Sequence, residues 1–242
     1  MLDIPSRYKI DKTFSIKTFI TADLTPKEKK RFKEEVIEIK LSHQIAGEEI
    51  PSFVNDEYDC QVILFFTVQL KKLKYANFVG PIIQGLVKSL CVIEFYDHSS
   101  QQVYCFSHKR LNIQDKSQIV VEETVYSSLT SMQFTDEING LLKEYIAYDN
   151  IYNRGNKLDF YLEMMIKAYI ISNLSLWSGT RALLASNVWY NRDTMLKLYH
   201  GLKEVEQRKK ELKSARTIAE QSTINAKLKK SYAQFKEMME KT

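Results

Sequence analysis

Hydrophobic side chains are most concentrated within residues 59–72, where Val62 to Val68 consists almost entirely of β-branched, aromatic and other apolar residues. Such residues favour extended strands, and an apolar run without alternation is typical of a strand buried on both faces. We therefore predict that residues 59–72 form the central strand of a sheet covered by helices. The lysines that follow, Lys71, Lys72 and Lys74, are expected to leave the core for solvent.

Upstream, the sequence has the features of a helix that starts at Thr25. Thr25 suits the N-cap, Pro26 suits the first helical position, and Glu28 completes a capping box. Apolar residues then recur at three- and four-residue steps, which predicts a helix running to about Ser42. This apolar stripe consists of Phe32, Val36 and Ile39, and it can extend to Leu41.

Downstream of the central strand, residues 76–89 show helical spacing, with the true start expected near Pro81. Leu90–Tyr96 and Gln102–Phe106 are predicted to form a hairpin, and Ser117–Tyr126 a further strand. Strand, helix and hairpin together indicate an α+β fold class. We predict an N-terminal mixed sheet domain with flanking helices over residues 1–132.

The second half of the chain changes to helical spacing almost throughout. Helices are predicted over Asp136–Tyr148, Leu158–Leu174 and Arg192–His200, with a break at Trp177 to Thr180. These segments define a helical region over residues 133–200. Aromatic residues within it, such as Phe160 and Tyr169, are interpreted as helix packing rather than as a surface for stacking bases.

Residues 201–242 form a coiled-coil-type C-terminal arm, because apolar residues recur at three- and four-residue steps between charged ones. No Gly or Pro follows Gly201. Polar residues take the apolar positions within residues 220–225, which marks either a register-fixing polar layer or the bend of a hairpin. The pattern is compatible with one long helix and with a helical hairpin.

Composition limits the classes of function. The 242 residues are 44% hydrophobic, which is enough for a folded core, and the net charge of +5 is too small to indicate a dedicated nucleic-acid binder. Three cysteines, Cys60, Cys91 and Cys105, lack the spacing of a zinc site or disulfide scaffold, so we expect buried thiols. The sequence carries no signal peptide or membrane-span pattern. We expect a cytoplasmic protein with no cofactor and no metal.

One enzymatic hypothesis uses the central strand. Nucleases with a PD-(D/E)xK core hold a divalent metal between two carboxylates, with a lysine beside the attacking water. Asp59, Gln69 and Lys71 occupy comparable positions. However, Gln69 is neutral, and ten residues of strand separate it from Asp59 by about 33 Å. A degenerate metal-dependent nuclease therefore stays an alternative, and a structural strand is the favoured interpretation.

Basic residues gather in the C-terminal arm, where they could neutralise phosphates and bind DNA without sequence preference. The candidate nucleic-acid-binding residues are Arg208, Lys209, Lys210, Lys213 and Arg216. Interleaved glutamates explain much of this pattern as ordinary i to i+4 helix support, as from Glu206 to Lys210. We favour helix support and keep a DNA-binding module as a second alternative.

Several segments resemble a bacterial family known as domain of unknown function 4391. They are the Met-Leu-Asp-Ile-Pro start, Ile39 to Ser42, the strand from Val62 to Lys71, the strand Val92 to Tyr96, and the C-terminal segment Ile224 to Lys230. The resemblance covers nearly the whole chain. It implies an accessory component encoded beside helicases and DNA methyltransferases of restriction-like antiphage defence islands, and it brings no established activity.

We accordingly expect a non-enzymatic accessory subunit that binds a large protein partner, a helicase or restriction-modification type enzyme, through its C-terminal arm. No membrane contact is expected, and direct contact with DNA stays open. The predicted partner-binding residues are Leu202, Val205, Leu212, Leu228, Tyr232 and Phe235.

Overall fold

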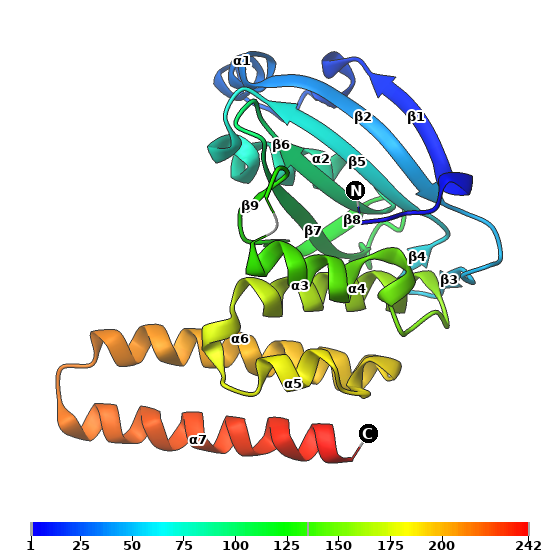
Figure 1. Ribbon diagram of the computed structural model, residues 1–242. Helices are drawn as coiled ribbons and strands as arrows, with labels where there is room; N and C mark the ends of the chain where they lie inside the picture. The colour runs from blue at the N-terminus through cyan, green and yellow to red at the C-terminus, as the bar shows by residue number, and fades with distance from the viewer. Residues whose placement is uncertain (1, 135, 242) are drawn as a thin grey trace. The chain divides into compact units, whose positions relative to one another are not determined.

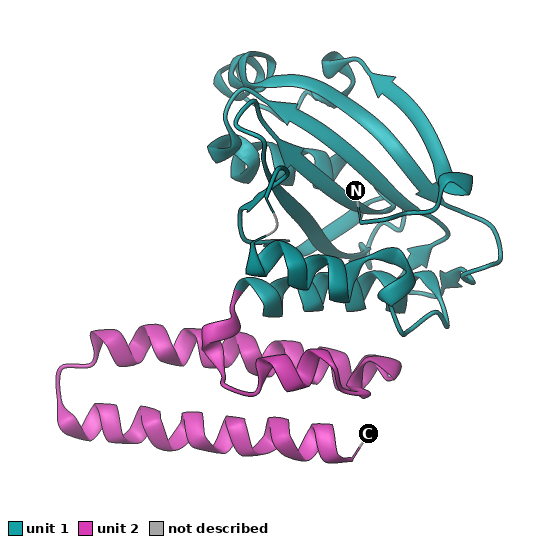
Figure 2. Cartoon of the chain, viewed as in Figure 1, with its two compact units in different colours: residues 1–172 teal, residues 173–242 magenta. Residues whose placement is uncertain are grey.

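The computed structural model describes residues 2–134 and 136–241 and divides the chain into two compact units. Unit 1 is Met1–Ser172 and unit 2 is Asn173–Thr242 (Figure 2). Unit 1 holds a mixed sheet with helices, and unit 2 is entirely helical among its described residues (Figure 1). The predicted α+β class, with an N-terminal mixed sheet and a C-terminal helical region, is confirmed.

Unit 1 contains four of the α-helices and all of the strands described. In chain order its elements are β1 (Lys9–Phe14), α1 (Pro26–Glu35), β2 (Val36–Ile45), β3 (Phe53–Val54), β4 (Asp59–Cys60), β5 (Ile63–Leu70), α2 (Ala76–Leu86), β6 (Leu90–Tyr96), β7 (Gln101–Leu111), β8 (Ile119–Tyr126), β9 (Thr130–Ser131), α3 (Glu137–Ile146) and α4 (Lys157–Ser172).

The main sheet has the strand order β1-β2-β5-β6-β7-β8, with β9 added to one end of β7. All neighbouring pairs are antiparallel except β5 and β6, which run parallel because α2 connects them. A central strand is present as predicted, since β5 (Ile63–Leu70) lies between β2 and β6. The predicted start at residue 59 is wrong, because Asp59–Cys60 forms β4 and pairs with β3 in a separate two-stranded sheet. The predicted hairpin of β6 and β7 is also confirmed.

The helix predicted from Thr25 to about Ser42 is wrong in its second half. The capping box of Thr25 and Glu28 forms as predicted, but α1 ends at Glu35 and the chain continues directly into β2. Phe32, Val36 and Ile39 satisfy a helical spacing, yet Val36 and Ile39 bury as well from a strand. Residues 36–45 form a strand because pairing with both β1 and β5 gives the backbone N–H and C=O groups of β2 hydrogen-bond partners on two sides.

The predicted start of the next helix near Pro81 is also wrong, because α2 starts at Ala76 and contains Pro81 in its interior. A helical turn at Leu73–Tyr75 leads into it, and the Leu73 N–H donates to Asp97 Oδ2 at 2.9 Å. The helix accommodates Pro81 at the loss of one backbone hydrogen bond. Gly80 lies where a Cβ would come within 2.4 Å of the Tyr126 hydroxyl, so α2 packs closely on β8.

Helices cover the two faces of the sheet differently. The apolar face of α2 packs on the face that carries Val68, Ile93 and Cys105. On the opposite face, α4 is buried along almost its whole length, and Tyr161 brings its hydroxyl to 3.0 Å from the Cys91 carbonyl. The same hydroxyl accepts from the Ser107 N–H at 2.7 Å. Helices α3 and α4 therefore belong to unit 1, which ends at Ser172.

Unit 2 contains α5 (Thr180–Leu184), α6 (Arg192–Ser214) and α7 (Ile218–Glu240). The last two form a helical hairpin, so the single long helix considered from the sequence is not present (Figure 1). The turn lies at residues 215–217, ahead of the predicted weak segment at 220–225. Thr217 and Glu220 form a capping box there, which starts the second helix.

The base of the hairpin is tightly packed. Phe235 is buried against the edge of the Trp177 ring, with ring centroids 5.4 Å apart, and Tyr232 stacks on the same ring. Gly201 lies opposite Phe235, and a Cβ at that position would approach the Phe235 ring to 2.7 Å. The absence of a side chain at Gly201 therefore allows α7 to lie close to α6.

Candidate functional site

The residues of the nuclease hypothesis do not come together. Asp59 lies on β4, exposed, and accepts a hydrogen bond from Gln61 Nε2 at 2.9 Å. Gln69 lies near the far end of β5, and Lys71 follows the end of that strand with an exposed side chain. Asp59 and Gln69 therefore lie on different strands that belong to different sheets, rather than along one strand as expected.

The described residues also supply no ligand set for a metal ion at these positions. Within residues 2–134 and 136–241, no group of three or more His, Cys, Asp or Glu side chains is arranged to hold one. The nuclease alternative consequently gains no support from the arrangement of Asp59, Gln69 and Lys71.

Polar residues instead form two rows across the middle of the main sheet. Strand register places four of them side by side in the first row, namely Lys40, Thr67, Glu94 and Tyr104. The second row follows two residues along each strand and consists of Glu38, Gln69, Tyr96 and Gln102. Because side chains alternate between faces, both rows lie on the face opposite α2.

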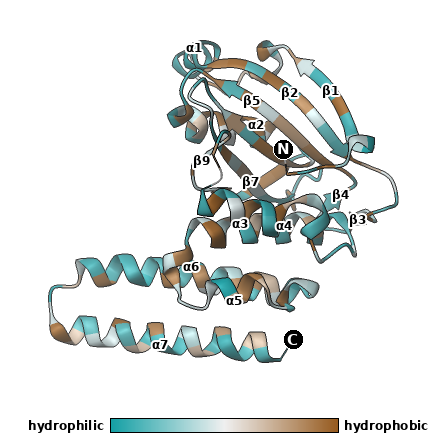
Figure 3. Cartoon of the chain, in the orientation of Figure 1, coloured by the Kyte–Doolittle hydropathy of each residue, from teal (hydrophilic) through white to brown (hydrophobic). Residues whose placement is uncertain are grey.

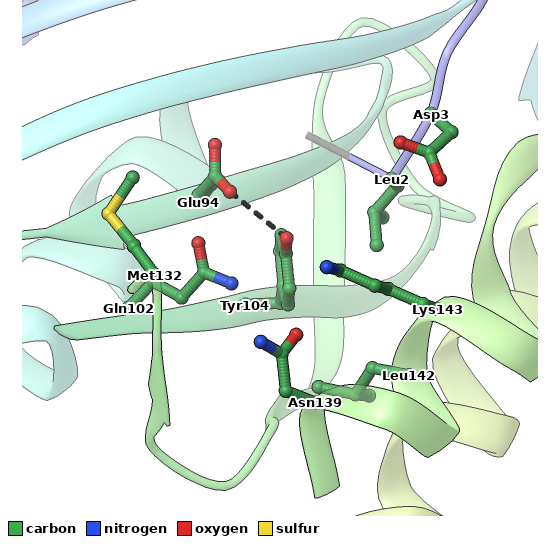
Figure 4. A pocket seen from close by; sticks show the side chains of 9 residues that line it. All are labelled: Leu2, Asp3, Glu94, Gln102, Tyr104, Met132, Asn139, Leu142 and Lys143. Carbon is green, nitrogen blue, oxygen red and sulfur yellow. Dashed lines mark hydrogen bonds between the residues drawn. The ribbon is translucent and has the colours of Figure 1, made fainter. Parts of the chain in front are cut away.

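A pocket of about 210 Å³ lies where these rows meet the N-terminal segment and α3. Its buried residues are Leu2, Glu94, Gln102, Tyr104, Asn139 and Leu142, and its exposed rim is formed by Asp3, Met132 and Lys143 (Figure 4). The backbone of Leu2 is held in place because the Tyr148 N–H donates to its carbonyl at 2.9 Å. The pocket therefore combines strand, helix and N-terminal residues.

Glu94 is the chemically distinctive residue of this pocket. It is 7% exposed on a strand that is otherwise almost wholly apolar, and its Oε1 accepts a hydrogen bond from the Tyr104 hydroxyl at 3.0 Å. Burial raises the pKa of Tyr104 well above its usual range, and the neighbouring Glu94 carboxylate raises it further. Tyr104 consequently stays protonated and fixes the orientation of the carboxylate.

The Gln102 side chain lines the pocket with Glu94 and is not used by the fold. Gln102 is 8% exposed, and its side-chain amide makes no hydrogen bond within the described part of the chain. Thr130, its partner in the β7–β9 pairing, is buried with a hydroxyl that has no hydrogen-bond partner among the described residues. Thr130 lies outside the pocket lining, whereas the Gln102 amide belongs to that lining and is available to a ligand. By contrast, the Asn139 amide donates to Ser131 O at 3.0 Å.

The pattern of residues along the chain does not predict this pocket. Leu90–Tyr96 was predicted as a strand, and Glu94 is the only charged residue within it. A charge in an apolar strand is a usable signal, since burying one is costly unless it has a role or a partner. Gln102 and Tyr104 carry no such signal, because they are common on half-exposed strands.

In unit 2, the structure places most of the predicted partner-binding residues inside the hairpin. Leu202, Val205, Leu228 and Phe235 are buried, and the Tyr232 hydroxyl donates to Leu176 O at 3.1 Å. Leu212 is half-buried. These side chains hold the two helices together, and their contact with a partner stays a prediction.

The predicted nucleic-acid-binding residues divide into two groups. Arg208, Lys209 and Lys210 have contacts within unit 2: Arg208 with Glu204 and Ser231, Lys209 with Ser175 O, and Lys210 with Glu206. Lys213 and Arg216 are exposed near the turn of the hairpin. Helix support thus accounts for some of the basic residues and leaves others at the surface.

The distal part of the hairpin, residues 206–227, has a distinct character, and we call it the tip. None of its side chains is buried, and Ile218 is 86% exposed. Figure 3 shows this end of the hairpin as mostly hydrophilic, in contrast to the sheet strands. The tip contains six Lys and Arg and three Glu, so its surface is basic.

Fold and site together define a two-unit mixed α/β protein with a polar pocket on its sheet and a separate basic helical hairpin. The chain belongs to the family described as Domain of unknown function (DUF4391), whose model matches residues 2–235. No curated protein and no solved structure matches it. None of the helices in the described residues combines the length and apolar character needed to span a bilayer.

Proposed function

We propose that the protein is a non-enzymatic accessory subunit, and that the tip of its helical hairpin binds a larger protein partner. The observation that supports this proposal is a long helical segment without any buried side chain. From residue 206 to residue 227, no side chain is buried, although α6 continues to Ser214 and α7 starts at Ile218.

The helical segments of the tip gain little stability from packing within their own unit. Short isolated helices are marginal in water, and most helical stability in proteins comes from packing an apolar face. The tip has only scattered apolar residues, such as Leu212, Ile218 and Ile224, and these are half-buried or exposed. A partner that covers them would supply the missing packing.

The charge of the tip favours an acidic partner surface. Its basic residues are Arg208, Lys209, Lys210, Lys213, Arg216 and Lys227, and its acidic residues are Glu206, Glu211 and Glu220. Complementary charge guides association and excludes competing partners. In keeping with the resemblance to defence-associated proteins, we take the partner to be a helicase or methyltransferase of a restriction-like antiphage system.

The test is affinity purification from the native host, followed by identification of co-eluting proteins. The full chain should retain a helicase-type or methyltransferase-type protein. A variant in which residues 209–226 are replaced by a short turn should lose it while keeping its thermal unfolding transition. Retention of the same partner by the shortened chain would overturn the proposal.

A charge-reversed pair gives a sharper version of this test. The Lys213→Glu, Arg216→Glu variant should lower partner retention at least tenfold, because both side chains are exposed on the tip. The matched control is Lys197→Glu, Lys236→Glu, which makes the same charge change at exposed positions outside the tip. Equal loss in both variants would mean that net charge, not the tip, controls binding.

Sequence-independent DNA binding is a second candidate, favoured by the composition of unit 2. Its 70 residues carry 14 Lys and Arg against 7 Asp and Glu. Binding of this kind weakens steeply as salt rises, by about 10³-fold or more between 50 and 200 mM if roughly six phosphates are contacted. DNA affinity that does not change over this range would eliminate this candidate.

A further inference from the structure

The pocket on unit 1 offers hydrogen-bonding groups that the fold leaves unused. The Glu94 carboxylate has Oε1 held by Tyr104 at 3.0 Å, while Oε2 has no partner among the described residues. The Gln102 amide supplies an unused donor and an unused acceptor beside it. Lys143 projects from α3 towards the same space, as Figure 4 shows, and no carboxylate within residues 2–134 and 136–241 lies within ion-pair distance of its ammonium group.

The charges and hydrogen-bonding groups of the pocket disfavour several classes of ligand. Two carboxylates, Glu94 and Asp3, against the single cation of Lys143 disfavour a phosphate or another multiply charged anion. No metal-ligand cluster is formed by the described residues, and a fully apolar ligand would leave Glu94 and Gln102 without partners. The pairing of an acceptor carboxylate on Glu94 with donors on Lys143 and Gln102 suits a neutral molecule that has donors on one edge and an acceptor next to them.

We propose that this pocket binds a guanine base. Guanine presents two adjacent donors, its ring N1–H and its 2-amino group, which match a carboxylate held in a fixed orientation by Tyr104. Next to them lies the O6 carbonyl, an acceptor for the Lys143 ammonium or the Gln102 amide. No other common nucleobase places two adjacent donors beside a carbonyl.

The shape of the pocket fits a base as well. Its volume of about 210 Å³ far exceeds the roughly 10–15 Å³ that accommodates one water. Leu2, Leu142 and Met132 supply apolar contacts, and proteins that enclose a single base typically combine such contacts with hydrogen bonds to its Watson–Crick edge. The site is formed by residues of unit 1, so it does not depend on the function proposed for the hairpin tip.

The base could come from a free nucleoside or from a single-stranded nucleic acid, and titration calorimetry on the full chain distinguishes the two. Guanosine should bind with a dissociation constant below about 1 mM. If a short oligonucleotide with one unpaired guanine binds at least tenfold more tightly, the source is a strand. If its affinity equals that of guanosine, the source is the nucleoside. In both outcomes adenosine and cytidine should show no measurable binding.

One altered ligand, inosine, and two protein variants test how the pocket would recognise guanine. Inosine lacks the 2-amino group and should bind about tenfold more weakly than guanosine, because one donor to Glu94 is lost. Glu94→Gln should weaken guanosine binding by tenfold or more, while its amide oxygen can still accept from Tyr104. The matched control is Glu38→Gln, the same chemical change in the neighbouring polar row and outside the pocket lining, which should leave affinity unchanged.

Absence of binding by both guanosine and the oligonucleotide would overturn the proposal, as would equal binding of inosine and guanosine. An affinity that Glu94→Gln leaves unchanged would do the same. Thermal unfolding of each variant, measured alongside, confirms that a loss of binding reflects the pocket rather than the fold.

Discussion

The two units of this protein treat charge in opposite ways. Unit 1 has nearly balanced composition, with 21 Lys and Arg against 23 Asp and Glu, and places several charged groups inside its fold. Lys157, for example, is buried and donates to the carbonyls of Gly47 and Ile50. Unit 2 has twice as many basic as acidic residues, and none of its described charged side chains is buried. Polar groups thus organise the interior of unit 1 and define the surface of unit 2.

Two ion pairs show this difference with the same chemistry. Glu163 and Lys167 on α4, and Glu206 and Lys210 on α6, are both Glu–Lys pairs at i to i+4 spacing. The α4 pair is fully buried, and Glu163 also accepts the backbone N–H groups of Tyr152 and Asn153, at 3.0 and 2.7 Å. The α6 pair is partly exposed to solvent. Identical spacing therefore has different consequences in the two environments.

The largest expected effect follows from breaking the buried pair. Glu163→Ala should lower the free energy of unfolding of unit 1 by about 3–5 kcal/mol, because Lys167 and two backbone N–H groups lose their acceptor inside the core. Burial lowers the pKa of Lys167, so the lysine of the variant can lose its proton in part. Hydrogen exchange of the strand amides, which belong to unit 1, provides the measurement. Unchanged exchange protection would contradict the buried role of the pair.

The next effect concerns the core of unit 2. Phe235→Ala should destabilise this unit by about 3 kcal/mol, since it removes a buried ring that packs on Trp177 and over Gly201. Both tryptophans of the chain, Trp177 and Trp189, lie in unit 2, so tryptophan fluorescence follows the unfolding of that unit. An equally large loss of hydrogen-exchange protection at the strand amides of unit 1 would contradict separate stabilisation of the two units.

A smaller effect is expected at the hairpin turn. Thr217→Ala removes the side-chain acceptor of the Glu220 N–H and should cost about 1 kcal/mol. Backbone N–H groups of Arg216 and Thr217 lower the pKa of Glu220, so the contribution of its carboxylate is complete above the unfolded pKa, about 4.3. That contribution is lost as pH falls through the lower folded pKa. Denaturant unfolding followed by far-UV circular dichroism, at pH 7 and at pH 3, measures the cost of Thr217→Ala and the loss of the Glu220 contribution. If Thr217→Ala has no cost at pH 7, or if the stability of the hairpin is the same at pH 7 and pH 3, the capping account is contradicted.

The smallest effect comes from the exposed pair. Glu206→Ala should change the stability of unit 2 by no more than about 0.5 kcal/mol, as is usual for solvent-accessible i to i+4 pairs. Tryptophan fluorescence during urea unfolding is again the measurement. A cost similar to that of Glu163→Ala would mean that the contrast between the two units does not depend on burial.

Much of the fold could be predicted from local pattern. The capping box at Thr25, the central strand, the hairpin of β6 and β7, and helices α3 and α4 all rest on spacing and on residue types that act within a few positions. The prediction was wrong at Val36, where helical and extended spacing agree equally well with the apolar residues. It was wrong again at Pro81, where a contact from Asp97 fixes an earlier start.

The candidate pocket could not be predicted in the same way. Glu94, Gln102 and Tyr104 lie on two strands, but Leu2 and Asn139 reach the pocket from segments far away in the chain. Only Glu94 was recognisable, as a charge in an apolar strand. The unused hydrogen-bonding capacity of Gln102 becomes visible only when its surroundings are known.

The sequence by itself determined the apolar strand at the centre of the sheet, the helix and hairpin that follow it, and the basic, Gly-free and Pro-free character of the C-terminal arm after Gly201. Short-range preferences and side-chain periodicity suffice for these features. The tertiary structure decided that β2 is a strand, that the arm turns back at residues 215–217 and that its apolar residues pack on each other. It also decided which polar residues share a pocket. These outcomes depend on contacts between residues distant in the chain, and such contacts have no signature in local spacing.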